Sequence, residues 1–283
     1  MRVLEALGAE AVPLGRSEAF VPVDTEAVSD EDRALARAWA AEHRLDALLT
    51  TDGDGDRPLL ADEQGHWLRG DIVGLLCARE LGIQALAVPV SCNSAIEACG
   101  AFDRVLRTRI GSPYVLAGME QLAGQHARVA GFEANGGFLL GTPVEEGGRR
   151  LAALPTRDAL LPALTLMVAS ARRNAPLSSL VADLPARYTA SDRLKEFPTE
   201  RSQALLAEWR EDLPTMQQVL GLESSVIETN GIDGLRITLE NGEIVHLRPS
   251  GNAPELRCYV EAQSEKQATA LVESVLAGLE NQI

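Results

Sequence analysis

Three aspartates stand at alternate positions in the segment DGDGDR, separated by glycines. They are Asp52, Asp54 and Asp56, and Arg57 follows them directly. Because glycine permits tight turns, the three carboxylates can face a single point. Two unit charges about 4 Å apart repel by roughly 4 kcal/mol at an effective dielectric near 20, and a divalent cation removes that repulsion. Oxygen ligands favour Mg²⁺ or Ca²⁺ over zinc or copper, so the pattern predicts a site for a hard divalent ion.

The same loop partly fits a calcium-binding EF-hand. Asp52, Asp54, Asp56 and Glu63 fall at positions one, three, five and twelve of such a loop. However, the sixth position of an EF-hand is glycine, and here it is Arg57, while the preceding LDALLTT is typical of a strand rather than a helix. A solvated acidic turn is the other alternative. We expect a metal site.

A second loop near the carboxyl end, RPSGNAPELR, carries groups that suit a phosphate. Guanidinium groups bind phosphate through paired hydrogen bonds, hydroxyl and amide side chains add donors, and glycine lets backbone N–H groups approach. Those residues are Arg248, Ser250, Gly251, Asn252 and Arg257. By spacing alone, this segment fits an ordinary surface turn between two strands equally well.

A third loop, GFEANGGF, follows a strand-like run in the middle of the chain. Its Glu133 can accept hydrogen bonds from sugar hydroxyls, and its Asn135 can both donate and accept them. Taken by itself, the segment is more typical of a hairpin with an Asn-Gly turn.

The elements that must position the first and third loops alternate between strand-like and helix-like patterns. This alternation predicts an α/β fold with a mixed, mainly parallel sheet flanked by helices. We expect strands near residues 47–51, 85–90, 103–107 and 127–132, and helices near residues 30–43, 71–81, 94–100, 113–124 and 157–173.

The pattern changes from about residue 175. Charged helical stretches near 199–220 precede four strand-like runs, and an amphipathic helix near 264–279 ends the sequence. The strand-like runs lie near residues 224–229, 234–239, 243–248 and 255–262. This order predicts a separate α+β domain that carries the arginine loop.

Composition excludes several classes of function. The net charge of −15 leaves no broad positive surface for a nucleic-acid backbone. No apolar run reaches the roughly 18 residues needed to cross a bilayer, so we expect a cytoplasmic protein that binds neither nucleic acid nor membrane. An acidic protein that binds a phosphate must gather a few arginines locally, as the loop RPSGNAPELR does.

The three loops, in this order, resemble those of the α-D-phosphohexomutases. In that family a DGDGDR loop binds magnesium, a GGExSGH-type loop binds sugar hydroxyls, and an RxSGTxPxLR-type loop binds the phosphate that is not being transferred. The resemblance implies that residues 1–64 are the remainder of domain 2, ending in the metal loop. It further implies that residues 65–175 are domain 3 and residues 176–283 are domain 4.

Several positions depart from the family pattern. In the middle loop Phe132 replaces the second glycine, Asn135 the usual serine and Gly137 the usual histidine. In the last loop Asn252 stands in place of threonine and Ala253 in place of a frequent acidic residue. These departures bear on sugar specificity but leave the candidate ligands in place.

The resemblance implies an enzyme that interconverts hexose 6-phosphate and hexose 1-phosphate through a phosphoserine and a hexose 1,6-bisphosphate. Mannose phosphates are the expected substrates, with glucose or glucosamine phosphates as alternatives. Mg²⁺ is the implied cofactor, Arg57 its charge partner, and Glu133 and Asn135 the sugar ligands.

The family's TASHNP-type serine loop does not occur in the sequence; Thr189–Ala–Ser191 is followed by Asp192. We therefore expect that the amino-terminal part of the enzyme, which carries that serine, is missing here and is a partner of this chain. A noncatalytic phosphosugar-binding protein, or one piece of a split enzyme, is the alternative of another class.

Overall fold

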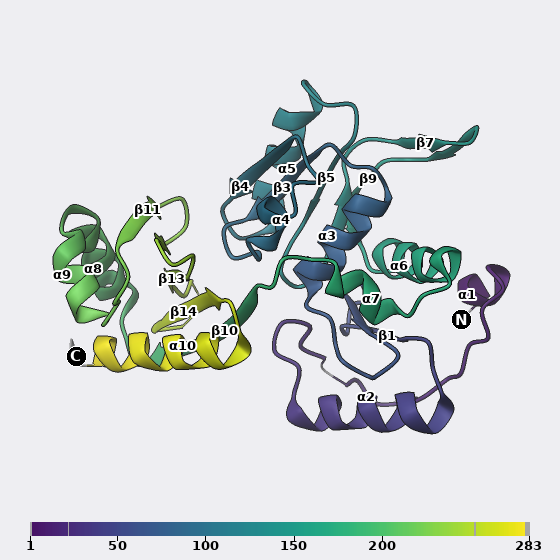
Figure 1. Cartoon of the computed structure of the whole chain (residues 1–283), viewed down its shortest axis with the longest axis horizontal. Coiled ribbons are helices and arrows are strands. Elements are labelled where there is room, and N and C mark those ends of the chain that lie inside the picture. Colours follow the sequence, from purple (N-terminus) through teal and green to yellow (C-terminus); the bar gives the residue numbers. More distant parts are fainter. Residues whose placement is uncertain (1, 22, 252, 281–283) are drawn as a thin grey trace. The chain divides into compact units, whose positions relative to one another are not determined.

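The computed structural model describes residues 2–21, 23–251 and 253–280, which form two compact units. The amino-terminal unit combines the chain up to Ala87 with Ala101–Arg104 and Leu116–Asp183. The carboxy-terminal unit combines Val88–Gly100, Val105–Val115 and the chain from Leu184 onward. In Figure 1 most of the first unit is purple to teal and most of the second is green to yellow.

The amino-terminal unit opens with the short helix α1 (Arg2–Ala6) and then α2 (Asp30–His43). The hydroxyl of Ser29 accepts a hydrogen bond from the Asp32 amide at 3.1 Å, which caps the start of α2. Arg44, in the left-handed conformation with φ of 50°, ends the helix. The helix expected at residues 30–43 is confirmed.

Strands β1 (Leu48–Thr51) and β2 (Pro58–Ala61) form an antiparallel pair in which Thr51 lies opposite Pro58. The acidic segment is therefore the connection of a β-hairpin. Because a hairpin connection is anchored at both ends by paired strands, the side chains it carries are held close to one another.

A five-stranded sheet follows, in the order β4-β3-β5-β6-β9. Its strands are β3 (Ala85–Pro89), β4 (Arg104–Thr108), β5 (Val129–Phe132), β6 (Phe138–Leu140) and β9 (Leu154–Asp158). Strands β3 and β5 run parallel, whereas β5–β6 and β6–β9 are antiparallel. The sheet is mixed, and the expectation of a mainly parallel sheet is corrected for β6 and β9. A short connection such as that between β5 and β6 can join only antiparallel strands.

Helix α3 packs against α6 and also contacts β2 and β5. The bounds of the other helices and of a small hairpin before residue 184 are α3 (Gly70–Glu80), α4 (Ala95–Ala98), α5 (Ser112–Ala123), α6 (Leu160–Arg173), α7 (Leu177–Ala182), β7 (Val144–Glu146) and β8 (Arg149–Leu151). The helix expected from residue 157 begins at Leu160 instead, because residues 154–158 pair with β6 as a strand.

The carboxy-terminal unit contains a five-stranded antiparallel sheet in the order β10-β14-β13-β12-β11. The four expected strands are present, and β10 adds a fifth that includes the TAS sequence. The bounds are β10 (Tyr188–Lys195), β11 (Val226–Asn230), β12 (Leu235–Leu239), β13 (Ile244–Pro249), β14 (Glu255–Ala262), α8 (Thr199–Glu211), α9 (Leu213–Val219) and α10 (Glu265–Glu280).

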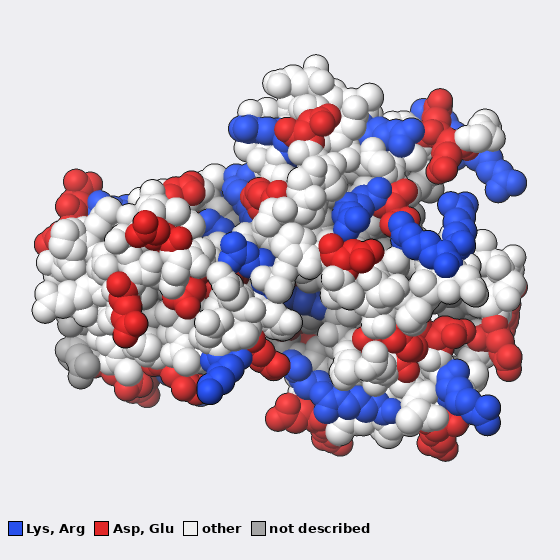
Figure 2. All heavy atoms as spheres, in the orientation of Figure 1, with Lys and Arg blue, Asp and Glu red and all other residues white. Residues whose placement is uncertain are grey.

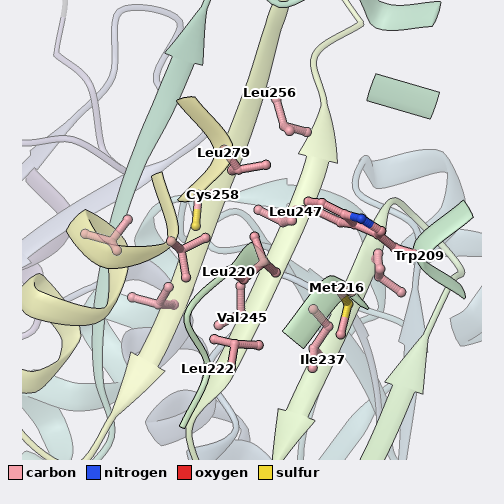
Figure 3. Close-up of a cluster of buried hydrophobic side chains, with 14 of the residues drawn as sticks. Trp209, Met216, Leu220, Leu222, Ile237, Val245, Leu247, Leu256, Cys258 and Leu279 are labelled. Carbon is pink, nitrogen blue, oxygen red and sulfur yellow. The ribbon is translucent and has the colours of Figure 1, made fainter. Parts of the chain in front are cut away.

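One apolar cluster holds this second unit together (Figure 3). Trp209 of α8, Met216 of α9 and Leu279 of α10 meet inward-facing strand residues such as Leu247 and Cys258. Burying a large apolar side chain contributes about 1.5–3 kcal/mol, so this cluster fixes the sheet that carries the arginine loop. Among the residues that the structure describes, no helix is both long and apolar enough to span a bilayer.

Candidate functional site

The acidic loop brings its three aspartates together at the end of the β1–β2 hairpin. One carboxylate oxygen from each of Asp52, Asp54 and Asp56 lies within 4.8 Å of the others. The Asp52 amide donates to the Arg57 carbonyl at 3.2 Å, and the Arg57 amide donates to Asp52 Oδ1 at 3.1 Å. Gly55 takes a φ of 78°, which turns the chain between the carboxylates.

The donor set fits a hard divalent cation. Asp56 Oδ1 is buried and makes no hydrogen bond, although a buried carboxylate oxygen ordinarily has a partner. A cation bonded to this oxygen would satisfy it, and all-oxygen ligation is what Mg²⁺ and Ca²⁺ prefer. Strands rather than helices flank the loop, so the EF-hand alternative is wrong.

The Arg57 side chain lies beside this cluster without a hydrogen bond to it. Its Nε atom is 3.5 Å from Asp52 Oδ2 and 3.6 Å from Asp56 Oδ1, and that buried N–H has no hydrogen-bond partner. The guanidinium therefore offsets negative charge in the loop while leaving Asp56 Oδ1 without a hydrogen bond.

The glycine-rich loop connects β5 to β6 and holds two buried polar side chains. Glu133 is 4% exposed and Asn135 is 7% exposed. Asn135 Oδ1 accepts from the Gly137 amide at 3.0 Å, and the Asn135 carbonyl accepts from the Thr25 hydroxyl at 3.0 Å. The loop is held by a hydrogen bond that its own asparagine side chain accepts.

Arg157, at the end of β9, joins the two loops. Its Nη1 atom donates to Asp56 Oδ2 at 2.9 Å, and its Nε atom donates to Glu133 Oε2 at 3.1 Å. Burial by itself lowers the pKa of Arg157, but the hydrogen bonds and charges of Asp56 and Glu133 outweigh burial and raise it. Sequence reasoning missed this residue, because a lone arginine beside a proposed helix start carries no motif.

The arginine loop connects β13 to β14 in the carboxy-terminal unit. Arg248 lies directly opposite Arg257 in the strand register, and its Nε atom donates to Asp233 Oδ2 at 3.1 Å. Ser250 is buried, with its amide bonded to the Glu255 carbonyl at 2.8 Å. An added Cβ at Gly251 would meet nothing within 4 Å, so the backbone there is open to a ligand. Asn252, the remaining expected ligand, lies outside the described residues.

A third arginine joins this pair. Arg193 of β10 is the register partner of Arg257, so Arg193, Arg257 and Arg248 form a row across three neighbouring strands. Side chains directly opposite each other in antiparallel strands lie on the same face of the sheet. Glu255 is 3.6 Å from Arg193 and 4.0 Å from Arg257, and it partly balances their charge. The sequence pattern did not indicate β10, so Arg193 was also missed.

Acidic and basic side chains are interspersed over the face of the molecule drawn in Figure 2. With a net charge of −15, the arginine row is a local concentration of positive charge within an acidic protein. Such an arrangement suits a small anion better than a polyanion.

Comparisons with known proteins match both parts of the chain. Residues 69–188 match the model of phosphoglucomutase/phosphomannomutase alpha/beta/alpha domain III, and residues 181–278 match that of the phosphoglucomutase/phosphomannomutase C-terminal domain. A phosphomannomutase of Salmonella muenchen is 51% identical over 99% of this chain, and one of Sinorhizobium fredii is 47% identical over 98%. The chain spans 59% and 58% of the lengths of these relatives.

Among solved structures, the N-acetylphosphoglucosamine mutase of Aspergillus fumigatus, in complex with GlcNAc-6P and magnesium, has a similar fold. The TM-score is 0.59 at 18% identity, and the match covers 87% of this chain and 52% of that one.

Proposed function

We propose, on the premise that this chain belongs to the phosphohexomutase superfamily, that it supplies the metal, sugar and phosphate sites of a phosphomannomutase. The reaction would interconvert mannose 6-phosphate and mannose 1-phosphate through a phosphoserine and a hexose 1,6-bisphosphate. Mannose phosphates are preferred because both relatives near 50% identity are phosphomannomutases. Phosphoglucosamine mutases at 26–30% identity make glucosamine phosphate the next candidate.

Asp52, Asp54 and Asp56 would hold Mg²⁺, whose positive charge would stabilise a phosphoryl group in transfer. The convergence of these carboxylates, with a buried oxygen that lacks a partner, is the observation that carries the proposal. Arg57 would act as a charge partner beside them. The related fungal mutase was crystallised with magnesium, which supports this choice of ion.

The sugar and its second phosphate would bind at the other two loops. Glu133 would accept hydrogen bonds from the sugar hydroxyls, and the Asn135 side-chain amide would donate to them. The phosphate that is not transferred would bind the loop residues Arg248, Ser250, Gly251, Asn252 and Arg257, and Arg193 would add a third guanidinium from β10. Because either phosphate must fit this site, flexible donors suit it better than a shape-specific pocket.

The proposed reaction needs a phosphoserine, and the 283 residues contain no TASHNP-type loop to supply it. The test therefore uses a chimera in which this chain replaces the corresponding part of the Salmonella muenchen enzyme, to which it is 51% identical. With Mg²⁺ and glucose 1,6-bisphosphate, the chimera is expected to convert mannose 1-phosphate to mannose 6-phosphate.

The exposed Asp54 provides the matched control, because Asp54→Asn removes one metal ligand without disturbing the core. This variant of the chimera is expected to lose Mg²⁺ binding and turnover while keeping its thermal transition. A folded chimera that binds Mg²⁺ and mannose 1-phosphate, yet turns over none of the 1-phosphates of mannose, glucose and glucosamine, would favour a phosphosugar-binding protein. Absence of both binding and turnover would overturn the proposal.

A further inference from the structure

Arg157 occupies a position that only the tertiary structure creates. It lies 101 residues after Asp56 and 24 residues after Glu133, yet it bonds both at 2.9 and 3.1 Å. The side chains of Arg157, Asp56 and Glu133 are 23%, 30% and 5% exposed, respectively, so Glu133 is the more buried of the two partners. A guanidinium placed this way connects the candidate metal loop to the candidate sugar loop.

Gly137 makes room for this contact. A Cβ added at Gly137 would lie 2.7 Å from Arg157 Cδ, closer than real Cβ atoms approach, and 3.0 Å from Arg157 Cγ, which is a tight contact. The stem of Arg157 therefore runs through the space that any larger residue at position 137 would fill.

Charge explains what the guanidinium does when no cation is bound. Three converging carboxylates repel one another, and Arg57 lies near them at 3.5–3.6 Å without a hydrogen bond. Arg157, by contrast, donates a hydrogen bond to Asp56, and such charge-assisted bonds are roughly twice as strong as neutral ones. Arg157 lies outside the acidic loop, and among the described contacts it is the positively charged side chain that forms a hydrogen bond with a carboxylate of that loop.

We propose that Arg157 is an internal counter-ion that holds Asp56 in the metal-free protein and that yields Asp56 when Mg²⁺ binds, while it keeps its bond to Glu133. The proposal rests on the metal site of the proposed function. A divalent cation and a guanidinium repel each other across a shared carboxylate, so cation binding weakens the Asp56 end of the bridge. The Glu133 end is farther into the protein and persists. Arg157 thereby transmits occupancy of the metal loop to the sugar loop.

Calorimetric titration of the 283-residue chain with Mg²⁺ tests this proposal, because the proposal predicts whether a change at Arg157 strengthens or weakens Mg²⁺ binding. Arg157→Gln removes both a competitor for Asp56 and a nearby positive charge, so we expect it to bind Mg²⁺ about tenfold more tightly than wild type. Without Mg²⁺ the same variant is expected to melt at a lower temperature than wild type. Added Mg²⁺ is expected to raise its melting temperature by more than it raises that of wild type. A residue that merely supported the fold would lower the melting temperature and weaken Mg²⁺ binding.

Two further variants separate charge from geometry. Arg157→Lys keeps the positive charge, so its Mg²⁺ affinity is expected to stay near that of wild type. Gly137→Ala pushes the Arg157 stem away, so it is expected to tighten Mg²⁺ binding to a lesser degree. In the Arg157→Gln background the Gly137→Ala change is expected to have no further effect on Mg²⁺ affinity, since the group it displaces is gone.

Arg173→Gln serves as the matched control. It removes another guanidinium of the amino-terminal unit, paired with Glu80 at 2.6 Å, and its effect on Mg²⁺ affinity is expected to be nil. Equal or weaker Mg²⁺ binding by Arg157→Gln overturns the counter-ion role. Failure of the wild-type chain and its Arg157→Gln variant to bind Mg²⁺ is a different result, which overturns the metal site itself. If Arg157→Gln does not fold, the Lys and Gly137→Ala variants decide the question alone.

Discussion

At the scale of single residues, burial and charge are balanced differently in the two candidate regions. The acidic loop gathers carboxylates that a guanidinium partly neutralises, whereas in the carboxy-terminal unit a buried histidine lies two residues before Arg248 on β13. His246 is 2% exposed, and its ring lies 5.6 Å from that of Tyr259. Its Nε2 atom is 2.6 Å from the Asp233 carbonyl oxygen, while its buried Nδ1 has no hydrogen-bond partner. This geometry fits the neutral ring with the proton on Nε2.

His246 should make the protein sensitive to acid. Burial lowers the pKa of His246 to about 4, and the nearby positive charges of Arg236 and Arg248 act in the same direction. In the unfolded chain a histidine takes up its proton near pH 6.5. As the pH falls from 6.5 towards 4, protons bind the unfolded state first, so folding stability is lost across this window.

His246→Gln is expected to remove that loss, since glutamine can still donate to the Asp233 carbonyl but does not titrate. Between pH 7 and pH 4.5 the free energy of unfolding of wild type should fall by about 2.5 kcal/mol more than that of the variant. Urea unfolding at the two pH values measures this difference. Identical pH dependence of wild type and His246→Gln would contradict the argument.

At the scale of elements, the sugar loop depends on how closely a helix approaches it. The first residue of α3 is Gly70, and an added Cβ there would lie 2.2 Å from the Gly136 amide nitrogen and 2.6 Å from the Ala134 carbonyl oxygen. Gly136 in turn has a φ of 89° and packs against Pro58, the first residue after the acidic loop. Helix α3, the sugar loop and the β1–β2 hairpin are thus in direct contact through backbone atoms.

Gly70→Ala should therefore disturb the site without any change to a candidate ligand. The neighbouring atoms are backbone and cannot rotate away, so we expect a loss of about 3 kcal/mol in unfolding free energy, the upper end of the usual cost of overpacking. Urea unfolding measures this loss. Gly124→Ala is the matched control, because its Cβ would meet its nearest neighbour at 3.9 Å, an ordinary contact. Equal stability of the two variants would show that α3 can shift to accommodate the methyl group.

At the scale of the whole molecule, the chain consists of two compact units, and each carries its own candidate ligand site. The acidic loop and Glu133 belong to the amino-terminal unit, whereas Arg193, Arg248 and Arg257 belong to the carboxy-terminal unit with its separate apolar core. A ligand stabilises only the folding unit whose native state binds it.

Differential scanning calorimetry should show this division as two transitions. Mg²⁺ at a hundred times its dissociation constant should stabilise the unit that binds it by about 2.7 kcal/mol. For a unit of this size, that corresponds to a shift of roughly 5–10 °C in one transition only. The Asp54→Asn variant should show no shift. A single transition would mean that the two units unfold as one, and equal shifts of two transitions would contradict a Mg²⁺ site confined to the amino-terminal unit.

The sequence by itself determined the features that depend on neighbouring residues. The spacing of Asp52, Asp54 and Asp56 predicted their convergence, the helix-like pattern near residues 30–43 predicted α2, and the arginine loop between two strands was located correctly. These features follow from local geometry, since alternating glycines, caps and turns act within a few residues.

Only the tertiary structure decided which distant side chains join those loops. Arg157 reaches Asp56 because residues 154–158 pair with β6 instead of starting a helix, and Arg193 lies beside Arg257 because β10 pairs with β14. Strand pairing depends on contacts between segments far apart in the chain, and a shift of one residue would turn each arginine to the opposite face. That dependence on register is why no local pattern around either arginine could indicate its role.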